Sequence, residues 1–370
     1  MKNVSGHYLR MVILLLLVLF TAAPALADGE TDVGTRGKKR AGFLIVPLPI
    51  YTPETKAAFT LTGMVHFRKD EMSRPSTFMA FLAYTQLGQF RAAGRAQSYF
   101  ADGRFHIAGS MGGAKWPDKF FGIGTDNTED DEEDFTSREF TGRLALQYRL
   151  GKHLKSGLST EFQHYEITKI EAGGILDTGN VRGAQGGDIF GIGPIVTFDS
   201  RDDSFFPRTG VYGQFSAVMF PDSLGEYDFQ RYRADLRRYI PAGERGVVAV
   251  QAYVNVVRGD IPFTNLSRIG GGGGFSLVRG YYSGLFRERD VAALQAEYRT
   301  QVWKKLGAAV FGSAGVIGND LFRARELAIK PAGGFGLRYR VGGEETINLR
   351  FDFAVGNDSS GVYFNILESF

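Results

Sequence analysis

The sequence contains no cysteine, which excludes disulfide bonds, thiolate metal ligands and a lipidated N-terminal cysteine. Histidine is scarce, with five residues in a chain of 370. His106 and Ser110 share one face of a predicted strand, but residues four apart in a strand are separated by about 13 Å, beyond hydrogen-bond reach. We therefore expect no enzyme activity, no metal site and no cofactor.

A concentrated charge and long apolar runs are lacking as well. The net charge is only +3 with no concentrated basic face, so nucleic-acid binding is not expected. The apolar run at residues 11–20 is well short of the about 20 residues that a membrane-spanning helix needs. It follows Lys2 and Arg10 and precedes the cleavage-site pattern Ala25-Leu26-Ala27, as in a secretory signal peptide over residues 1–27. Residues 28–41 are too few for a domain and are expected to form a short periplasmic segment.

Glycine and aromatic residues are abundant, with 49 glycines, 31 phenylalanines and 16 tyrosines, as in β-rich chains with many turns. Several segments alternate apolar with polar or charged residues, most clearly 140–150, 247–258 and 346–356. A soluble β-sandwich also alternates. Here, however, charged residues recur on the second face, and the segments run for about 10 to 14 residues against about 5 or 6 in globular strands. The pattern favours a transmembrane antiparallel β-barrel with a wet interior.

About 16 such segments follow one another, an even number as bacterial barrels require. The long connections 114–135, 167–186 and 259–288 are all odd-numbered, whereas the even-numbered connections include the short turns. With both termini in the periplasm, the long loops lie on the extracellular side of the outer membrane and the short turns lie on the periplasmic side. We assign residues 42–370 to one outer-membrane barrel, with 259–288 as its sixth extracellular loop. The predicted strands are 42–51, 57–68, 76–88, 90–100, 103–113, 136–150, 153–166, 187–199, 209–220, 227–240, 246–258, 289–303, 305–318, 329–342, 346–356 and 361–369.

A glycine run and an acidic run in the loops resemble a phosphate-binding loop and a calcium-binding loop, but each lacks residues that the motif requires. The glycine run at 270–274 is followed neither by a lysine with serine or threonine nor by the helix of a phosphate-binding loop. It predicts flexible backbone or close approach to the barrel wall. The acidic run at 129–134 lacks the spaced ligands and central glycine of a calcium loop, so we expect a solvated external loop at the lipopolysaccharide surface.

Five short motifs, in order along the chain, carry a resemblance to a known family. They are Asp199-Ser200-Arg201 with Pro207 and Gly210, then Val278-Arg279-Gly280-Tyr281, Ala296-Glu297-Tyr298-Arg299, Leu349-Arg350-Phe351-Asp352, and the terminal Phe370. With them the chain resembles the BamA/TamA superfamily of outer-membrane assembly and secretion barrels, the bacterial surface antigen type. The resemblance implies that the sixth loop folds into the lumen, where Arg279 pairs with acidic groups of the wall. Alternation turns Glu297 and Asp352 inward near Arg299, which makes these two acids its predicted partners.

The C-terminal strand resembles an assembly signal, in which Val362, Phe364, Ile366 and Phe370 share one face with the irregular Glu368 among them. We expect no POTRA domains and no attached lipase, which departs from the family's usual pattern, and Ser313 stands where an aspartate is frequent in the family.

The resemblance implies a barrel that assists insertion or translocation of polypeptides. Its expected partners are outer-membrane lipid and lipopolysaccharide, polypeptide clients and a separate periplasmic protein that delivers them. A passive pore and a purely structural barrel are the alternatives that the sequence leaves open.

Overall fold

We describe the protein from a computed structural model, over residues 40–52, 56–68, 74–179, 181–271, 277–323, 327–341 and 346–370. Several sequence predictions fall outside these described residues: the signal peptide at 1–27, nearly all of the segment 28–41, most of the glycine run, and the turn around Gly343. None of the helices in the described part of the chain is long and apolar enough to span a membrane.

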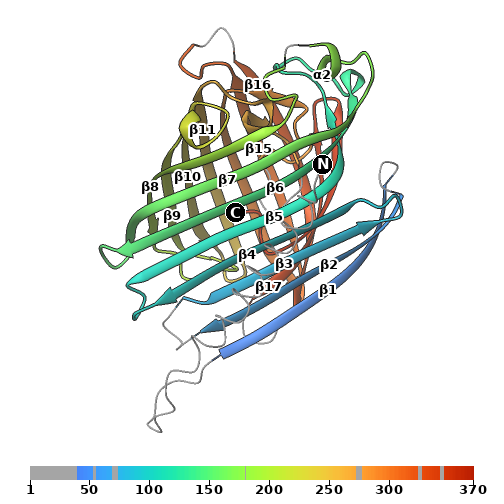
Figure 1. Ribbon diagram of the computed structural model, residues 1–370. Helices are drawn as coiled ribbons and strands as arrows, with labels where there is room; N and C mark the ends of the chain where they lie inside the picture. Colours follow the sequence, from blue (N-terminus) through green and yellow to red (C-terminus); the bar gives the residue numbers. More distant parts are fainter. Residues whose placement is uncertain are drawn as a thin grey trace.

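Sixteen strands pair in chain order into one antiparallel sheet, which confirms the all-β fold and the predicted strand number (Figure 1). The loop before β14 adds the short pair β12 (Ser267–Ile269) and β13 (Phe286–Glu288), and α2 (Ile175–Thr178) lies in the loop after β7. Three 3-10 turns are η1 (Glu129–Asp131), η2 (Asp222–Leu224) and η3 (Phe263–Asn265). The strands of the sheet are β1 (Arg40–Thr52), β2 (Lys56–Arg68), β3 (Ser76–Thr85), β4 (Phe90–Phe100), β5 (Phe105–Phe120), β6 (Glu133–Arg149), β7 (Leu154–Ile170), β8 (Gly187–Asp199), β9 (Gly210–Phe220), β10 (Phe229–Ala242), β11 (Gly246–Gly259), β14 (Asp290–Trp303), β15 (Leu306–Gly318), β16 (Ala328–Val341), β17 (Ile347–Gly356) and β18 (Ser359–Ile366).

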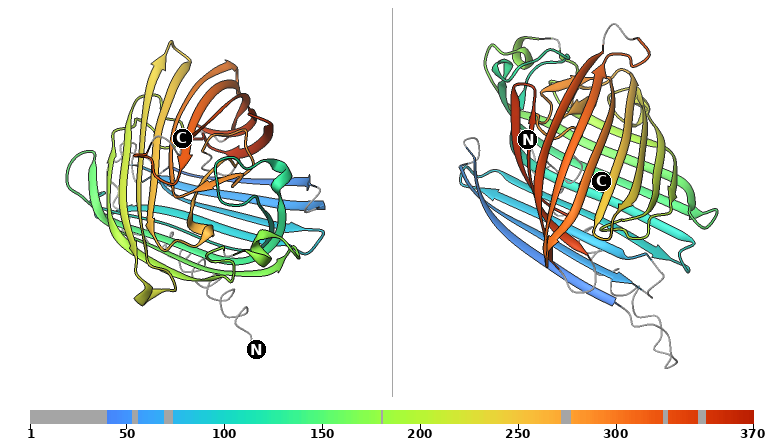
Figure 2. Two further views of the ribbon diagram at one scale, coloured as in Figure 1. Left: turned by 90° about the horizontal axis from the view of Figure 1, so that it is seen from above. Right: turned by 180° about the vertical axis from the view of Figure 1, so that it is seen from behind.

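The sheet curls so that its first and last strands come round to the same side when seen from above (Figure 2). Within the described residues, pairing runs from β1 to β18 without a ladder that joins these two edge strands. We call the line between β1 and β18 the seam. The fold is therefore a barrel that is open along one line.

Alternation sorts the side chains of the wall into an apolar outer row and a polar inner row. In β14, Leu294 and Tyr298 are 58% and 41% exposed on the outside, while Gln295 and Glu297 are buried inside. The outer row suits hydrocarbon, and the inner polar groups need partners because an unpaired buried polar group is destabilising. This arrangement, expected from the sequence, aims Glu297 into the lumen.

Three strands extend at least three residues further than predicted, among them β7, which continues to Ile170. β5 continues to Phe120 and β6 begins at Glu133, so the fifth connection is shorter than 114–135. Phe120 and Phe135 are buried together with Phe263 of the sixth loop. This apolar packing stabilises continued strand pairing where the sequence pattern predicted a polar loop.

The end of the chain departs from the predicted outward row. β18 ends at Ile366, and the backbone turns at Leu367, whose φ is 72°. Val362 and Phe364 remain exposed on the outside, but Phe370 is 4% exposed and lies against β10 and β11 inside the barrel. The prediction that Phe370 shares a face with Val362 and Phe364 is therefore wrong. In the outward row, the carboxylate of Glu368 would face lipid, where a charged group is destabilising. The turn at Leu367 places both Glu368 and Phe370 inside the barrel instead.

The two ends of the barrel should differ in accessibility on cells. A tag after Asp130 or Gly173, in long connections, should be labelled on intact cells. A tag after Lys152, in the short turn between β6 and β7, should be labelled only after the outer membrane is permeabilised. Labelling of the Lys152 tag on intact cells would reverse the orientation.

Candidate functional site

The segment between β11 and β14 folds back into the barrel interior. β12 and β13 pair as a short hairpin, and Ile269, Val278 and Tyr281 are almost completely buried. They belong to one apolar cluster with Ile317 of β15. Gly315 permits this close approach, because a Cβ atom there would lie 2.7 Å from Ile269 Cδ1 and 2.9 Å from Val278 Cγ2. The apolar contact brings the residues after Val278 to the inner face of the C-terminal strands.

Arg279 lies at the centre of this contact. Its Nη2 is 2.7 Å from Glu297 Oε2 on β14, and its Nη1 is 2.5 Å from Asp352 Oδ2 on β17. The guanidinium also stacks on Phe311 of β15, with Cζ 3.5 Å from the ring centroid. All three charged side chains are at most 1% exposed. The structure thus places Arg279 between both predicted acids.

A second arginine, Arg338 on β16, binds the same two carboxylates. Its Nη2 is 2.9 Å from Glu297 Oε1, and its Nη1 is 2.6 Å from Asp352 Oδ1. Its Nε is 2.9 Å from Glu368 Oε2, so the acid that is irregular in the sequence pattern has a buried partner. We call Arg279, Arg338, Glu297, Asp352 and Glu368 the lumenal ion network. Sequence reasoning missed Arg338, although alternation along β16 turns this residue inward.

Arg299 and Arg350 add two more buried cations at the edge of the lumenal ion network. Arg299 Nη2 donates to the main-chain oxygen of Phe370 at 3.2 Å, and its Nε lies 3.7 Å from Glu297 Oε1. Arg350 Nε lies 3.3 Å from Asp352 Oδ2. Four buried arginines, Arg279, Arg299, Arg338 and Arg350, therefore surround three buried carboxylates. The arrangement offers no nucleophile with an adjacent base, and what it can do is hold the loop to the wall.

The residues on either side of Arg279 are fixed through their backbones. Val278 has φ 59°, uncommon for a β-branched residue, and its N–H donates to Gln295 Oε1 at 3.1 Å. Gly280 has φ 123°, and a Cβ there would lie 2.7 Å from the main chain of Val355. Its N–H donates to Tyr363 Oη at 2.9 Å. Glycine is therefore required at this position, which explains its place in the motif.

Tyr281 completes the docking. Its hydroxyl donates to the main-chain oxygen of Pro331 at 2.6 Å and accepts from the N–H of Asn357 at 3.0 Å. Gly356 leaves room for the ring, because a Cβ there would lie 2.4 Å from Tyr281 Cζ. Together, the motif from Val278 to Tyr281 contacts every strand from β14 to β18.

The strand-turn signature lies at the opposite end of the barrel. Arg201 Nε and Nη2 donate to the two carboxylate oxygens of Asp199 at 2.9 and 3.0 Å, and Arg74 Nη1 lies 3.0 Å from the same carboxylate. Gly210 has φ 102°, a conformation that favours glycine, and Pro207 is buried within the turn. The signature fixes a compact turn, and within the described residues no ion pair joins it to the lumenal ion network.

The same turn, residues 200–209, reaches both sides of the seam. Phe205 is buried in a cluster with Met64 of β2 and Ile347 of β17, and Leu44 of β1 and Ile366 of β18 pack against this cluster. Asp203 Oδ2 lies 3.4 Å from Arg68 Nη2 at the end of β2. The turn therefore connects the first and last strands of the sheet at the end opposite the long loops.

The long loops are tied to one another above the barrel mouth. Arg182 Nε donates to Asp260 Oδ1 at 2.8 Å, and both side chains are half-exposed. The hydrogen bond from Arg182 holds the pKa of Asp260 below its ordinary value. An exposed pair of this kind adds little stability, so the docking of the sixth loop depends on the buried contacts.

Comparison with known proteins gives a family and a fold. The model of the Omp85 superfamily domain matches residues 84–370. Among solved structures, BamA from Haemophilus ducreyi lacking POTRA domains 1-3 is similar with a TM-score of 0.54 at 10% identity, over 90% of this chain and 69% of that chain. CdiB from Escherichia coli gives a TM-score of 0.57 at 14% identity, over 91% of this chain and 63% of that chain. CdiB from Acinetobacter baumannii gives 0.54 at 11% identity, over 88% of this chain and 59% of that chain.

A search of curated proteins finds no match. The chain spans between 59% and 69% of the length of the three solved structures. At 10% to 14% sequence identity, this similarity shows a shared fold only.

Proposed function

This chain belongs to the Omp85 superfamily and is an outer-membrane β-barrel, and from that premise we propose that it helps to insert or translocate polypeptides at the outer membrane. The open seam is the observation that carries the proposal. An unpaired edge strand offers a row of main-chain donors and acceptors with which another chain can pair. Because hydrocarbon satisfies none of these groups, a client strand that pairs at the seam is stabilised there.

The two edges of the seam differ in length. β1 has 13 residues and β18 has 8, so even complete pairing between them would leave part of β1 without a partner. Phe43 and Ile45 of β1 face outward and are exposed. A client strand with alternating apolar residues would continue this outward row. We include in the proposal a separate periplasmic protein that delivers clients, and lipid and lipopolysaccharide as the surroundings.

Site-specific photo-crosslinking tests the proposal. A photoreactive residue at Phe43 in β1 or at Val362 in β18 should form adducts with newly made outer-membrane or secreted polypeptides. Leu236 in β10 and Val310 in β15 are matched controls, since they are also exposed on the outer face but lie within the paired sheet. Equal adducts at all four positions, or adducts with lipid alone, would count against a client site at the seam.

A passive pore is the second candidate, because the lumen contains a cavity of about 820 Å³ with many charged side chains. Planar-bilayer recording separates the two. A large, steady conductance that is insensitive to Arg279→Ala would favour the pore, since undocking of the sixth loop should change the conductance of a loop-filled lumen. A structural barrel would give neither polypeptide adducts nor such conductance.

A further inference from the structure

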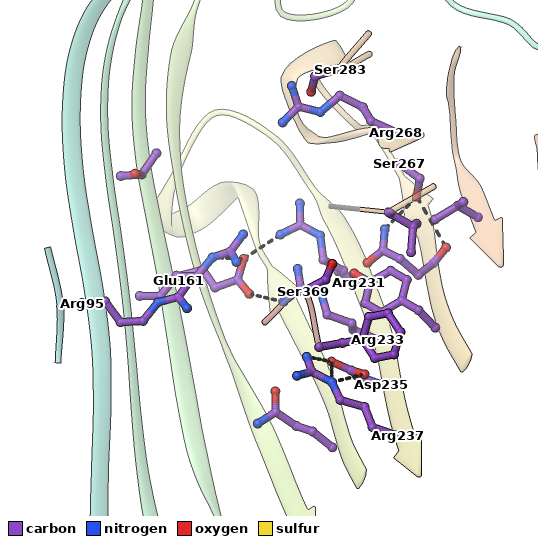
Figure 3. A pocket seen from close by; sticks show the side chains of 18 of the residues that line it. Arg95, Glu161, Arg231, Arg233, Asp235, Arg237, Ser267, Arg268, Ser283 and Ser369 are labelled. Carbon is purple, nitrogen blue, oxygen red and sulfur yellow. Dashed lines mark hydrogen bonds and ion pairs between the residues drawn. The ribbon is translucent and has the colours of Figure 1, made fainter. Parts of the chain in front are cut away.

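The lumenal cavity lies beside the docked loop (Figure 3). One side is formed by inward side chains of β4, β6, β7 and β10. The other side is formed by the loop hairpin, including Arg268 and Ser283, and by Ser369 near the chain end. The cavity thus lies between the barrel wall and the two segments that fold into the lumen.

The side chains of the lining carry excess positive charge, with seven arginines against four acidic residues. Glu161 alone serves three of these arginines. Its Oε2 lies 2.6 Å from Arg231 Nη1 and 3.6 Å from Arg143 Nε, and its Oε1 lies 3.3 Å from Arg233 Nη1. One carboxylate cannot neutralise three guanidinium groups, so part of their charge is left for a ligand.

The other three acids do not remove this excess. Asp235 Oδ2 is bound by Arg237 Nη2 at 2.6 Å, and Glu368 is bound by Arg338 in the lumenal ion network. Among the described residues, Glu139 is the one lining acid with no arginine within ion-pair distance. A single acid remains against several incompletely paired cations.

Two arginines of the lining have no carboxylate within ion-pair distance in the described part of the chain, and both are exposed to the cavity: Arg95 on β4 and Arg268 on β12. Arg95 and Arg143 stand in register on either side of Ser110 of β5. Residues paired across strands share a face, and neighbouring strands are about 4.8 Å apart, so the two arginines start about 10 Å apart with a hydroxyl between them. Two side chains of this length converge readily on one anion.

We propose that this cavity binds a small, multiply charged oxyanion bearing phosphate groups, held by Arg95, Arg143 and Arg268. The planar guanidinium fork suits phosphate oxygens, and several forks from different strands suit a ligand with more than one charge. Entry of an anion also relieves the repulsion among the arginines. Because Arg268 belongs to the loop hairpin, an occupied cavity joins the wall to the loop. This inference goes beyond the handling of polypeptides, since it requires neither a client nor an open seam.

Titration calorimetry of the purified full-length barrel in detergent with sodium pyrophosphate, at constant ionic strength, tests the site. We expect saturable binding. The double variant Arg95→Gln/Arg268→Gln should weaken it about 100-fold, at about tenfold for each charge-assisted contact. The matched control is Arg138→Gln/Arg323→Gln, which makes the same charge change at exposed positions outside the cavity lining and should leave the affinity unchanged.

The first variant should fold, because Arg95 and Arg268 leave no carboxylate behind when they are neutralised, and heat-modifiable mobility on gels checks this. If the double variant fails to fold, Arg95→Gln alone should still weaken binding about tenfold. Absence of saturable binding to the wild-type barrel, unchanged affinity in the cavity variants, or equal losses in the control pair would each overturn the proposal. Binding of lipopolysaccharide without binding of pyrophosphate would also overturn it, since the proposed ligand is a soluble anion.

Discussion

Replacing Arg279 by alanine should lower the free energy of unfolding of the barrel by about 3–5 kcal/mol, the typical loss when one partner of a buried ion pair is removed. Glu297 and Asp352 are completely buried, and each would lose its contact with the loop. Arg338 still binds both acids, so we expect the lower part of this range, together with an undocked loop. The midpoint of urea unfolding and the protease sensitivity of residues 260–289 measure the two effects.

Several further variants show whether the effect comes from the network. Arg279→Lys should recover only part of the loss, because a lysine cannot bind two carboxylates through a planar fork. Arg182→Ala breaks an exposed pair between loops and should cost under about 1 kcal/mol. Double-mutant cycles of Arg279→Ala with Asp352→Asn and with Glu297→Gln should both show coupling. Full additivity in both cycles would mean that the loop does not dock through this arginine.

Phe370→Ala should have the second-largest effect, a loss of about 3 kcal/mol or more in the free energy of unfolding, because it empties a buried aromatic site. Phe370 packs with Tyr239, Val247 and Ala249 inside the barrel. Phe364→Ala is the matched control, since Phe364 lies on β18 shortly before the turn, is 38% exposed on the outer face and should cost clearly less. In cells, loss of Phe370 should also reduce the amount of heat-modifiable barrel, as expected for part of an assembly signal.

Tryptophan fluorescence in brominated lipid locates the two side chains directly. Tryptophan at position 364 should be quenched by the lipid, whereas tryptophan at position 370 should be protected inside the barrel. Strong quenching at position 370 would restore the outward row predicted from the sequence.

The order of strands was predictable because lipid outside and water inside impose a period of two on every strand. Leu294 and Gln295 illustrate this, since adjacent residues go to opposite faces. The same period of two predicts that Glu297 and Asp352 point into the lumen, where both can pair with Arg279. The pairing of Glu368 with Arg338 depends instead on where β18 ends. The strand ends before Leu367, whose backbone is in the left-handed conformation, and the alternating pattern does not predict this turn.

Contacts between distant connections leave no periodic signal. The contact of the turn at 200–209 with Arg68 joins segments more than a hundred residues apart, and both residues of the pair, Arg68 and Asp203, look like ordinary charged residues in the sequence. The extension of β5 and β6 has the same origin, because the aromatic packing of Phe120 with Phe263 exists only once the sixth loop has returned to the lumen.

The turn at 200–209 holds the two sides of the seam together at one end, so we expect the seam to open by rotation about that end. The cluster around Phe205 joins the two sides of the seam at one end, and Asp203 adds an ion pair to β2 there. Within the described residues, no strand pairing joins β1 to β18 along the remaining length. β1, with 13 residues, is about 44 Å long at about 3.4 Å per residue. A rotation of only about 10° around the tied end would then part the far ends by about 8 Å, more than the about 4.8 Å that one additional strand occupies. A wedge-shaped opening therefore needs little angular change, and it is widest beside the long loops.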